Sequence, residues 1–542
     1  MRRLPIRRTL AVGALKAVVA TLTAGSLATT ADATKSAAVT PLYGGTLVVA
    51  AGDPGPLNPA ITSSGQAHPV TGQIFNGLIR LDRYFEPKPD LARSWTVSKD
   101  GKTYTFNLAP NVRWHDGRPF TSADVKFTYE QVLLKLHPRT RTLAEFIAGV
   151  SAPSRNVVVF RLNRRYAPFL TWLDEDNGAI LPRHLYEGTD PLTNPVNLRP
   201  VGTGPFKFES YTPGDRVVLV RNPSYFKPGL PRLDRVIFRN IPSAQAAPAF
   251  EAGEVDLFMF PSGPDALRFL NRPGITVTER GREGFARVVP LILNVRRSPF
   301  DDVRVRRAIA WALDTEFIAR TAYAGVLRPA TSPLTRFIPW AFTSKVQRYT
   351  HNPARANAIL DEVGLRRDGN GVRFRTSLIF DVGFARQAEL IKAQLGAVGI
   401  VVDLKLMEFN SWVRTLYTDW NYDMGYTNYT HPPDPDVGWK RIYVCSNIVK
   451  APFTNGSGYC NRQVDELFEQ AAVELDRKKR GEIYRRLQRK LASEVPVIPL
   501  ADGIGPWIYR DSEFRGFGNA GSKEPFAFSE QVWWTKGSPS RQ

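Results

Sequence analysis

The residues best suited to hold a small molecule lie in an aromatic-rich segment, numbers 412–439. Flat aromatic side chains offer apolar faces together with polar tips, a combination that suits a partly polar organic ligand. Tyr426, Asn428 and Tyr429 precede a proline-rich loop, and we expect them to line a site. Trp420 and Tyr422 fit a hydrophobic core equally well, so both interpretations stay open for them.

The sequence offers little for catalysis or for a metal site. The six histidines do not fall at ligand spacing, and the two cysteines have no histidine neighbours. We find neither a Gly-x-Ser-x-Gly nucleophile elbow nor a phosphate-binding glycine loop. With 51 Asp and Glu residues some close pairs arise by chance, so no acid/base couple is nominated. We expect no catalytic residue, no metal and no cofactor.

The two cysteines, Cys445 and Cys460, bracket a segment rich in glycine, proline, asparagine and serine. In an exported protein this spacing suits a disulfide, which would contribute about 3 kcal/mol by constraining the unfolded chain. Two buried free thiols are the alternative.

The chain is strongly basic, with a formal net charge of +21. Its Lys and Arg residues are spread along the sequence and form no stripe interleaved with aromatics, so we do not expect nucleic acid as a partner. The densest run, Arg477 to Arg480, is interpreted as the solvated face of a helix. A basic surface attracts acidic ligands or anionic membrane surfaces.

Residues 1–33 have the pattern of a cleavable signal peptide. Four arginines begin the chain, a mostly apolar stretch follows, and Ala31-Asp32-Ala33 fits a cleavage site. Lys16 interrupts the apolar stretch, which makes an uncleaved anchor the weaker interpretation. Arg7-Arg8 leaves twin-arginine export open beside the general route. No cysteine lies near the cleavage site, so we expect an exported protein without a lipid anchor.

Turn and capping signals, together with hydrophobic periodicity, predict the helices and strands that position the candidate site residues. Asp100-Gly101 separates alternating runs at 94–98 and 103–108, which predicts a β-hairpin. Thr121 precedes an acid by three residues and predicts a helix start. A strand at 377–381, a helix at 385–398 and a strand at 401–407 predict an α/β unit with a crossover helix. Apolar stripes at 464–475 and 483–491 are interpreted as core-facing helices, followed by a strand at 495–500.

Several segments in order resemble the extracytoplasmic solute-binding proteins of peptide- and nickel-type importers, solute-binding protein family 5. The first runs from Asn76 to Glu130 and contains the hairpin and helix start described above. The others are Val201–Phe208, Arg221–Phe226, Leu233–Phe238, Leu293–Val295 and Pro299–Arg306. The resemblance extends from about residue 44 to about residue 500.

The resemblance implies an α/β fold with two lobes, the type II periplasmic binding protein of the large peptide-binding kind, with an additional inserted subdomain. The first lobe would comprise 41–66, 200–290 and 495–542. The inserted subdomain would comprise 67–199, and the second lobe 291–494. Such lobes close over a ligand by hinge motion, and the ligand favours the closed state through contacts made by both lobes.

The resemblance also implies ligand contacts. Peptide-binding members carry an aspartate that pairs with the ligand's α-amino group, and Tyr429 stands at that position here. A buried ammonium without a carboxylate is costly, which argues against binding through a free N-terminus. Asp434 either substitutes for the missing acid or serves only turn chemistry. Three further positions match the family's cleft or the crossing between its lobes, namely Asp53, Trp412 and Asn294.

We therefore predict a non-catalytic, monomeric periplasmic receptor. It captures a peptide or peptide-like organic solute and delivers it to an ABC permease with its ATPase subunits. Aromatic contacts would come from Trp412, Tyr426 and Tyr429, and polar contacts from Asn428, Asp434 and Asp53. The alternatives are an exported hydrolase of peptides or glycans, and a binding protein that serves a sensory or chaperone role.

Overall fold

The computed structural model describes residues 42–62, 64–430, 434–517 and 531–535. The predicted signal peptide, 1–33, lies outside these ranges. Two seven-stranded sheets organise the described chain into two lobes, and a separate four-stranded sheet forms an inserted subdomain. The predicted α/β class with two lobes is confirmed.

The first sheet has the strand order β12-β20-β11-β1-β10-β9-β8, in which β1 runs parallel to both of its neighbours. Alternate residues of β1 face two different cores, one shared with the inserted subdomain and one under helix α6 (Ser243–Glu251). The strands are β1 (Thr46–Ala51), β8 (Phe206–Thr212), β9 (Arg216–Arg221), β10 (Arg235–Asn240), β11 (Leu257–Phe258), β12 (Ile275–Thr278) and β20 (Trp507–Arg510).

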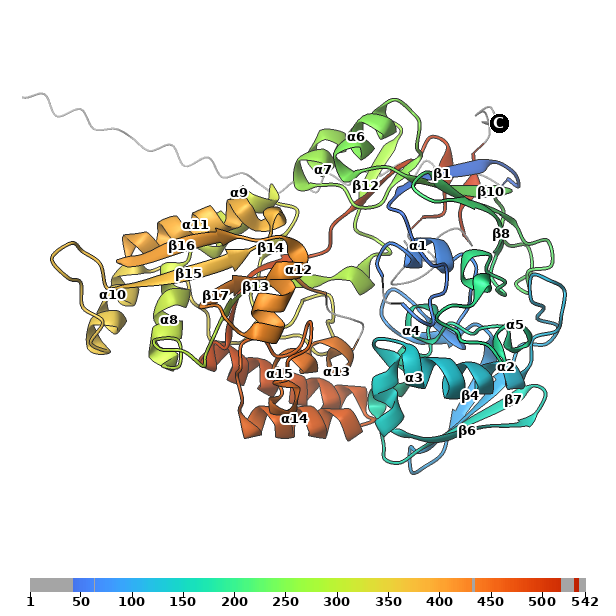
Figure 1. Cartoon of the computed structure of the whole chain (residues 1–542), viewed down its shortest axis with the longest axis horizontal. Helices are drawn as coiled ribbons and strands as arrows, with labels where there is room; N and C mark the ends of the chain where they lie inside the picture. The colour runs from blue at the N-terminus through green and yellow to red at the C-terminus, as the bar shows by residue number, and fades with distance from the viewer. Residues whose placement is uncertain (1–41, 63, 431–433, 518–530, 536–542) are drawn as a thin grey trace, which may run out of the picture. The chain divides into compact units, whose positions relative to one another are not determined.

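The second sheet has the order β14-β19-β13-β17-β15-β16, with β18 also paired to β13. Parallel strands β15 and β16 are joined through helix α11 (Ala385–Ala397), as the strand–helix–strand pattern predicts. Figure 1 shows helices α8, α10 and α11 beside β15 and β16. The strands are β13 (Arg287–Leu293), β14 (Arg328–Pro329), β15 (Phe374–Phe380), β16 (Ile400–Leu406), β17 (Met424–Tyr426), β18 (Tyr429–Thr430) and β19 (Val497–Gly503).

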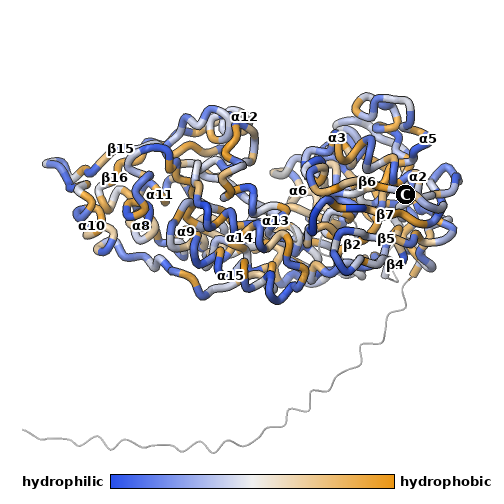
Figure 2. Tube along the Cα trace, turned by 90° about the horizontal axis from the view of Figure 1, so that it is seen from below, coloured by the Kyte–Doolittle hydropathy of each residue, from blue (hydrophilic) through white to orange (hydrophobic). Residues whose placement is uncertain are grey.

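Helices cover both faces of the second sheet. One face packs against α8 (Val303–Ala312), α9 (Thr315–Tyr323), α10 (Pro353–Glu362) and α11. The other packs against α14 (Arg462–Val473) and α15 (Arg477–Glu494), whose apolar stripes are buried as predicted except at Leu475, which lies beyond the end of α14 and is exposed. In Figure 2 hydrophilic and hydrophobic residues alternate along α15, as expected for a helix with one buried face.

The inserted subdomain is built on the antiparallel sheet β4-β5-β7-β6. Its strands are β4 (Ala92–Val97), β5 (Thr103–Leu108), β6 (Ile147–Ser154) and β7 (Val157–Leu162). The β4–β5 pairing confirms the predicted hairpin, and Gly101 adopts the positive φ of 69° that its turn requires. Helix α2 (Ser122–Phe127) begins with the predicted capping box between Thr121 and Asp124.

Strand pairing corrects two of the expected lobe boundaries. Strands β13 and β19 pair with each other over Arg287↔Gly503 to Ile292↔Val497, so both belong to the second sheet. The chain therefore leaves the first sheet before Arg287, not at 290, and returns to it after Gly503, not at 495. Apolar strands carry no local mark of the sheet they will join, because pairing depends on residues far away in sequence.

His115, in a turn of the inserted subdomain, binds the chain where it returns to the first lobe. Its Nδ1 accepts a hydrogen bond from the backbone N–H of Gly202 (3.2 Å), and its Nε2 donates to the carbonyl of Gly204 (3.0 Å). A protonated ring would have to give up the first of these bonds. Burial lowers the pKa of His115 to about 4 from an ordinary value of 6.5.

We expect this histidine to weaken the fold in acid. Between pH 6.5 and about 4 the unfolded state binds a proton that the folded His115 refuses, so stability falls as the pH falls through this window. Each unit of the pKa difference corresponds to about 1.4 kcal/mol. Urea denaturation at pH 7 and pH 4.5 should show a smaller acid loss in His115→Gln than in the wild type. Equal losses would contradict the assignment.

Candidate functional site

The aromatic-rich segment lies along one edge of β13. It begins in α12 (Phe409–Val413), continues through β17 and β18, and reaches α13 (Pro435–Gly438). Strand β18 pairs with β13 at Val288↔Tyr429 and Arg287↔Thr430, next to the point where the chain enters the second sheet. Tyr426 and Tyr429 are therefore held by β13, the strand with which the chain enters the second sheet.

Tyr426 and Tyr429 are both buried, the former with no exposed surface. The hydroxyl of Tyr426 lies 2.7 Å from the hydroxyl of Tyr323, and its ring packs against Phe384 at 4.6 Å. The hydroxyl of Tyr417 donates to that of Tyr429 (3.2 Å). This corrects the expectation that Tyr426 faces an open cleft, because neighbouring helices cover its ring. Direct ligand contact by either tyrosine stays a prediction.

Asp434 already has a charged partner in the folded chain. Its carboxylate forms a two-pronged ion pair with Arg480, whose Nη2 lies 2.7 Å from Oδ1. It also accepts from the backbone N–H of Asp436 (3.0 Å) and so caps α13. The cap agrees with the turn-chemistry interpretation. Arg480 itself is buried, which corrects the expectation that the whole basic run is solvated.

The remaining predicted residues of the second lobe differ in exposure. Asn428 is exposed between β17 and β18. Trp412 is buried against Tyr417. Asn294 is buried at the far end of β13 from the lobe crossing, where its Nδ2 donates to the carbonyl of Tyr422 (2.8 Å). Of these three predicted residues, only Asn428 is exposed.

Asp53 lies after β1 in the first lobe. Its carboxylate accepts hydrogen bonds from the Tyr211 hydroxyl (2.5 Å) and from the backbone N–H groups of Gly55 (3.0 Å) and Gly214 (2.5 Å). The Tyr211 bond is the main cause that lowers the pKa of Asp53, so the carboxylate stays charged in mild acid. These bonds fix the loop after β1, and a ligand would be an additional partner.

Sequence reasoning missed four residues that stand beside the predicted tyrosines. Tyr323 and Tyr417 are their hydroxyl partners, and Arg287 and Arg441 lie near enough to interact electrostatically with the two tyrosine pairs. Arg287 directly precedes the apolar run 288–293, and a charged residue at the start of a buried strand could have indicated a functional role. Lys440-Arg441 looks like an ordinary solvated pair, so the sequence carried no comparable signal for Arg441.

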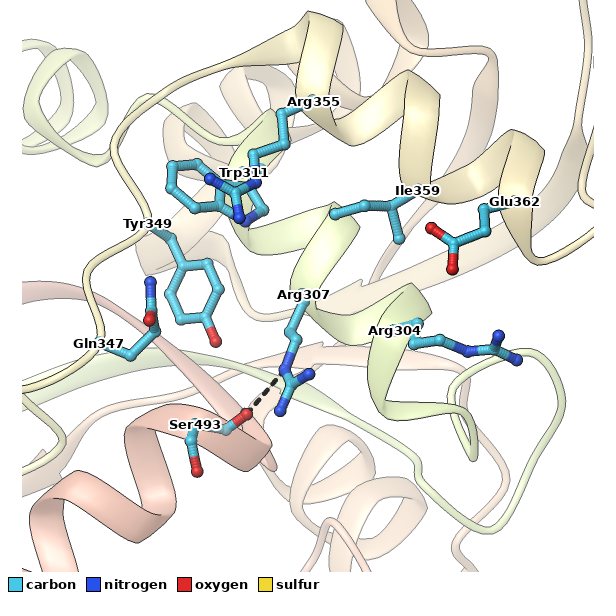
Figure 3. Close-up of a pocket in the computed structure, with 9 residues that line it drawn as sticks. All are labelled: Arg304, Arg307, Trp311, Gln347, Tyr349, Arg355, Ile359, Glu362 and Ser493. Atoms are coloured by element: carbon cyan, nitrogen blue, oxygen red, sulfur yellow. Dashed lines mark hydrogen bonds between the residues drawn. The ribbon is translucent and has the colours of Figure 1, made fainter.

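A pocket of about 420 Å³ lies elsewhere on the second lobe (Figure 3). Arg355 stacks over the ring of Trp311 at 4.4 Å, Tyr349 meets that ring edge-on at 5.3 Å, and Arg307 donates to the carbonyl of Ser493 (2.8 Å). The pocket contains none of the predicted contact residues. Its walls come from one lobe only, so closure of the lobes would leave it unchanged.

Cys445 and Cys460 form a disulfide, which confirms the predicted pairing over the free-thiol alternative. Among the described residues, no three His, Cys, Asp or Glu side chains are grouped so that they could hold a metal ion. Within the same residues no helix has both the length and the apolar character to cross a bilayer.

Two α/β lobes, connected by the chain segments from β12 to β13 and from β19 to β20, define the class of two-lobed binding proteins. The model of the bacterial extracellular solute-binding proteins, family 5 middle region, matches residues 86–449. The chain belongs to this family, and it is a solute-binding protein.

Curated relatives match over most of their length. The dipeptide-binding protein of Escherichia coli is 28% identical over 486 residues, which cover 83% of this chain and 88% of that protein. Heme-binding protein A of Haemophilus influenzae is 27% identical over 483 residues, with 83% and 85% covered.

Solved structures show the same architecture. The periplasmic binding protein DppA of Helicobacter pylori, in complex with the peptide STSA, is 25% identical with a TM-score of 0.77, covering 91% of this chain and 99% of that chain. NikA of Brucella suis, in complex with Fe(III)-EDTA, is 25% identical with a TM-score of 0.78, covering 89% and 99%.

Proposed function

We propose that this protein is the solute-binding subunit of an ABC importer for a peptide or peptide-like organic solute. The observation that carries the proposal is the family match over residues 86–449 together with the two-lobed fold. The solute is captured by closure of the lobes and delivered chemically unchanged to a membrane permease and its ATPase subunits.

The names of the relatives support a peptide-like solute. Two of them, the dipeptide-binding protein of Escherichia coli and the DppA complex with STSA, are peptide binders by name. Heme-binding protein A and the NikA complex with Fe(III)-EDTA show that the same architecture also serves other organic solutes. The solute of this chain therefore has to follow from its own residues.

Closure requires contacts from both lobes, since a ligand held by one lobe alone does not change the balance between open and closed states. In this proposal Asn428, Tyr426 and Tyr429 act from the second lobe and Asp53 from the first. Two short segments, one from β12 to β13 and one from β19 to β20, carry the chain between the lobes. In this proposal these two segments form the hinge.

The protein acts as a monomer in the periplasm after removal of residues 1–33, without catalysis and without nucleic acid. Residues 1–33 contribute +4 of the formal net charge of +21, and the remaining +17 raises the local concentration of acidic solutes near the protein surface.

Native mass spectrometry of freshly purified protein tests this function. We expect a bound organic solute that is released with unchanged mass. Small-angle scattering should then show a smaller radius of gyration after the solute is added back. The proposal fails if the protein converts the solute to a product, as the hydrolase alternative requires. It also fails if the scattering profile is the same with and without the bound solute.

A further inference from the structure

Arg287, the first residue of β13, carries a guanidinium group that the protein leaves uncompensated. Its Nε is buried and has no hydrogen-bond acceptor among the described residues. The hydroxyls of Tyr323 and Tyr426 interact with it electrostatically, a second cation, Arg282, lies near it, and no carboxylate of the described chain forms an ion pair with it. Burial lowers the pKa of Arg287, which reflects the cost of keeping this cation away from water.

Arg441, which follows α13, repeats this arrangement beside the second tyrosine pair. Its Nε is also buried without an acceptor in the part of the chain that the structure describes. The hydroxyls of Tyr417 and Tyr429 lie close enough to interact with it, and Arg139 of the inserted subdomain adds a further positive charge. As whole residues both arginines are half-buried.

Arginines that are buried as whole residues in the described chain have partners at their guanidinium groups, including Arg282, whose Nε also lacks an acceptor but whose Nη1 donates to the carbonyls of Met259 and Pro506. Arg480 pairs with Asp434. Arg306 donates to the carbonyls of Phe300 (2.8 Å) and Glu494 (2.8 Å). The fold therefore supplies partners where an arginine serves only packing, and a neutral tyrosine does not replace the missing negative charge at Arg287 or Arg441.

Among the described residues next to β18, the nearby carboxylates of Asp434 and Asp436 already have cationic partners, Arg480 and Lys440. Tyr429 stands where an acid would receive an α-amino group, and Asp434 is held by Arg480. Asp436 is buried and accepts from the hydroxyl of Tyr166 (3.0 Å). The charge pattern around β18 thus favours a negative ligand over a positive one.

We propose that the solute is an anion, and that Arg287 and Arg441 bind its carboxylate groups while Tyr426 and Tyr429 support them from the side. This inference rests on the proposed function and specifies its ligand as an acidic peptide-like solute. A guanidinium forms two parallel hydrogen bonds to a carboxylate, and such a pair formed away from water is strong and specific.

Calorimetric titration with matched probes tests the inference. The acidic probe is N-acetyl-Glu-Glu, the neutral probe of the same shape is the amide of N-acetyl-Gln-Gln, and the ammonium probe is the amide of Ala-Ala. We expect the acidic probe to bind at least tenfold more tightly than the other two. Arg287→Met and Arg441→Met should each weaken its binding at least tenfold. Arg462→Met is the control, because that side chain is 92% exposed on α14, and it should leave the affinity unchanged.

Thermal unfolding without ligand separates binding from structure. Removing an uncompensated cation should leave the melting temperature of Arg287→Met and Arg441→Met unchanged or higher, whereas a structural role would lower it. A lower melting temperature in both variants would overturn the inference.

The remaining outcomes distinguish this inference from the proposed function. Equal binding of the ammonium or neutral probe, or acidic binding that survives in both arginine variants, overturns the anionic ligand and leaves solute import intact. Arginine-dependent binding of citrate without binding of any peptide probe supports the anion and removes the peptide. A wild type that binds neither the acidic probe nor citrate overturns the inference, while import is judged separately by the co-purified solute.

Discussion

Asp434→Asn should lower the free energy of unfolding by about 3–5 kcal/mol, because it leaves the buried Arg480 without its charge partner. Urea denaturation followed by circular dichroism measures the change. Glu466→Gln is the matched control. It removes one member of an exposed pair with Arg462, and it should cost about 0.5 kcal/mol or less.

A double variant makes this result specific to the ion pair. Asp434→Leu combined with Arg480→Met removes both charges, and it should recover much of the stability that either single change loses. If Asp434→Asn costs no more than the exposed control, the carboxylate is not needed for the fold. It would then be available to a ligand, as the sequence alone allowed.

Tyr426→Ala should also destabilise the fold, by about 3–5 kcal/mol, because the ring is fully buried between the sheet and the helices around Phe384. Tyr426→Phe keeps the ring and removes only the hydroxyl that meets Tyr323, so it should cost about 1 kcal/mol. Tyr84→Ala, at a side chain that is 64% exposed, is the control and should change stability by about 0.5 kcal/mol or less.

Chemical denaturation of the three tyrosine variants distinguishes a packed from an open environment. Full stability in Tyr426→Ala, together with weaker solute binding, would show that this residue faces a cleft. The buried environment found here predicts the opposite order, with stability lost first and binding lost because the connection between β17 and β18, which carries Asn428, is disturbed.

These two predictions concern residues whose surroundings the sequence does not reveal. Asp434 and Arg480 are 46 residues apart, and Tyr323 and Tyr426 are 103 apart. A local pattern identifies an acid near a turn or a tyrosine in an apolar strand. It does not identify the distant side chain that the fold will bring to it, since that depends on how strands and helices pack.

Local physics did determine a large part of the architecture. The Asp100-Gly101 turn, the capping box of Thr121 with Asp124 and the crossover through α11 each follow from backbone preferences or from periodicity over a few residues. The disulfide between Cys445 and Cys460 closes a short segment and was predictable for the same reason.

The sequence by itself indicated an α/β solute-binding protein of family 5 and located those helices and strands that have a clear local signal. Only the tertiary structure decided which sheet receives β13 and β19, that Asp434 is neutralised by Arg480, and that Arg287 and Arg441 are left with tyrosine neighbours and no carboxylate. The reason is physical. Turns and caps are fixed by neighbouring residues, whereas burial and charge pairing are fixed by residues that meet only when the chain has folded.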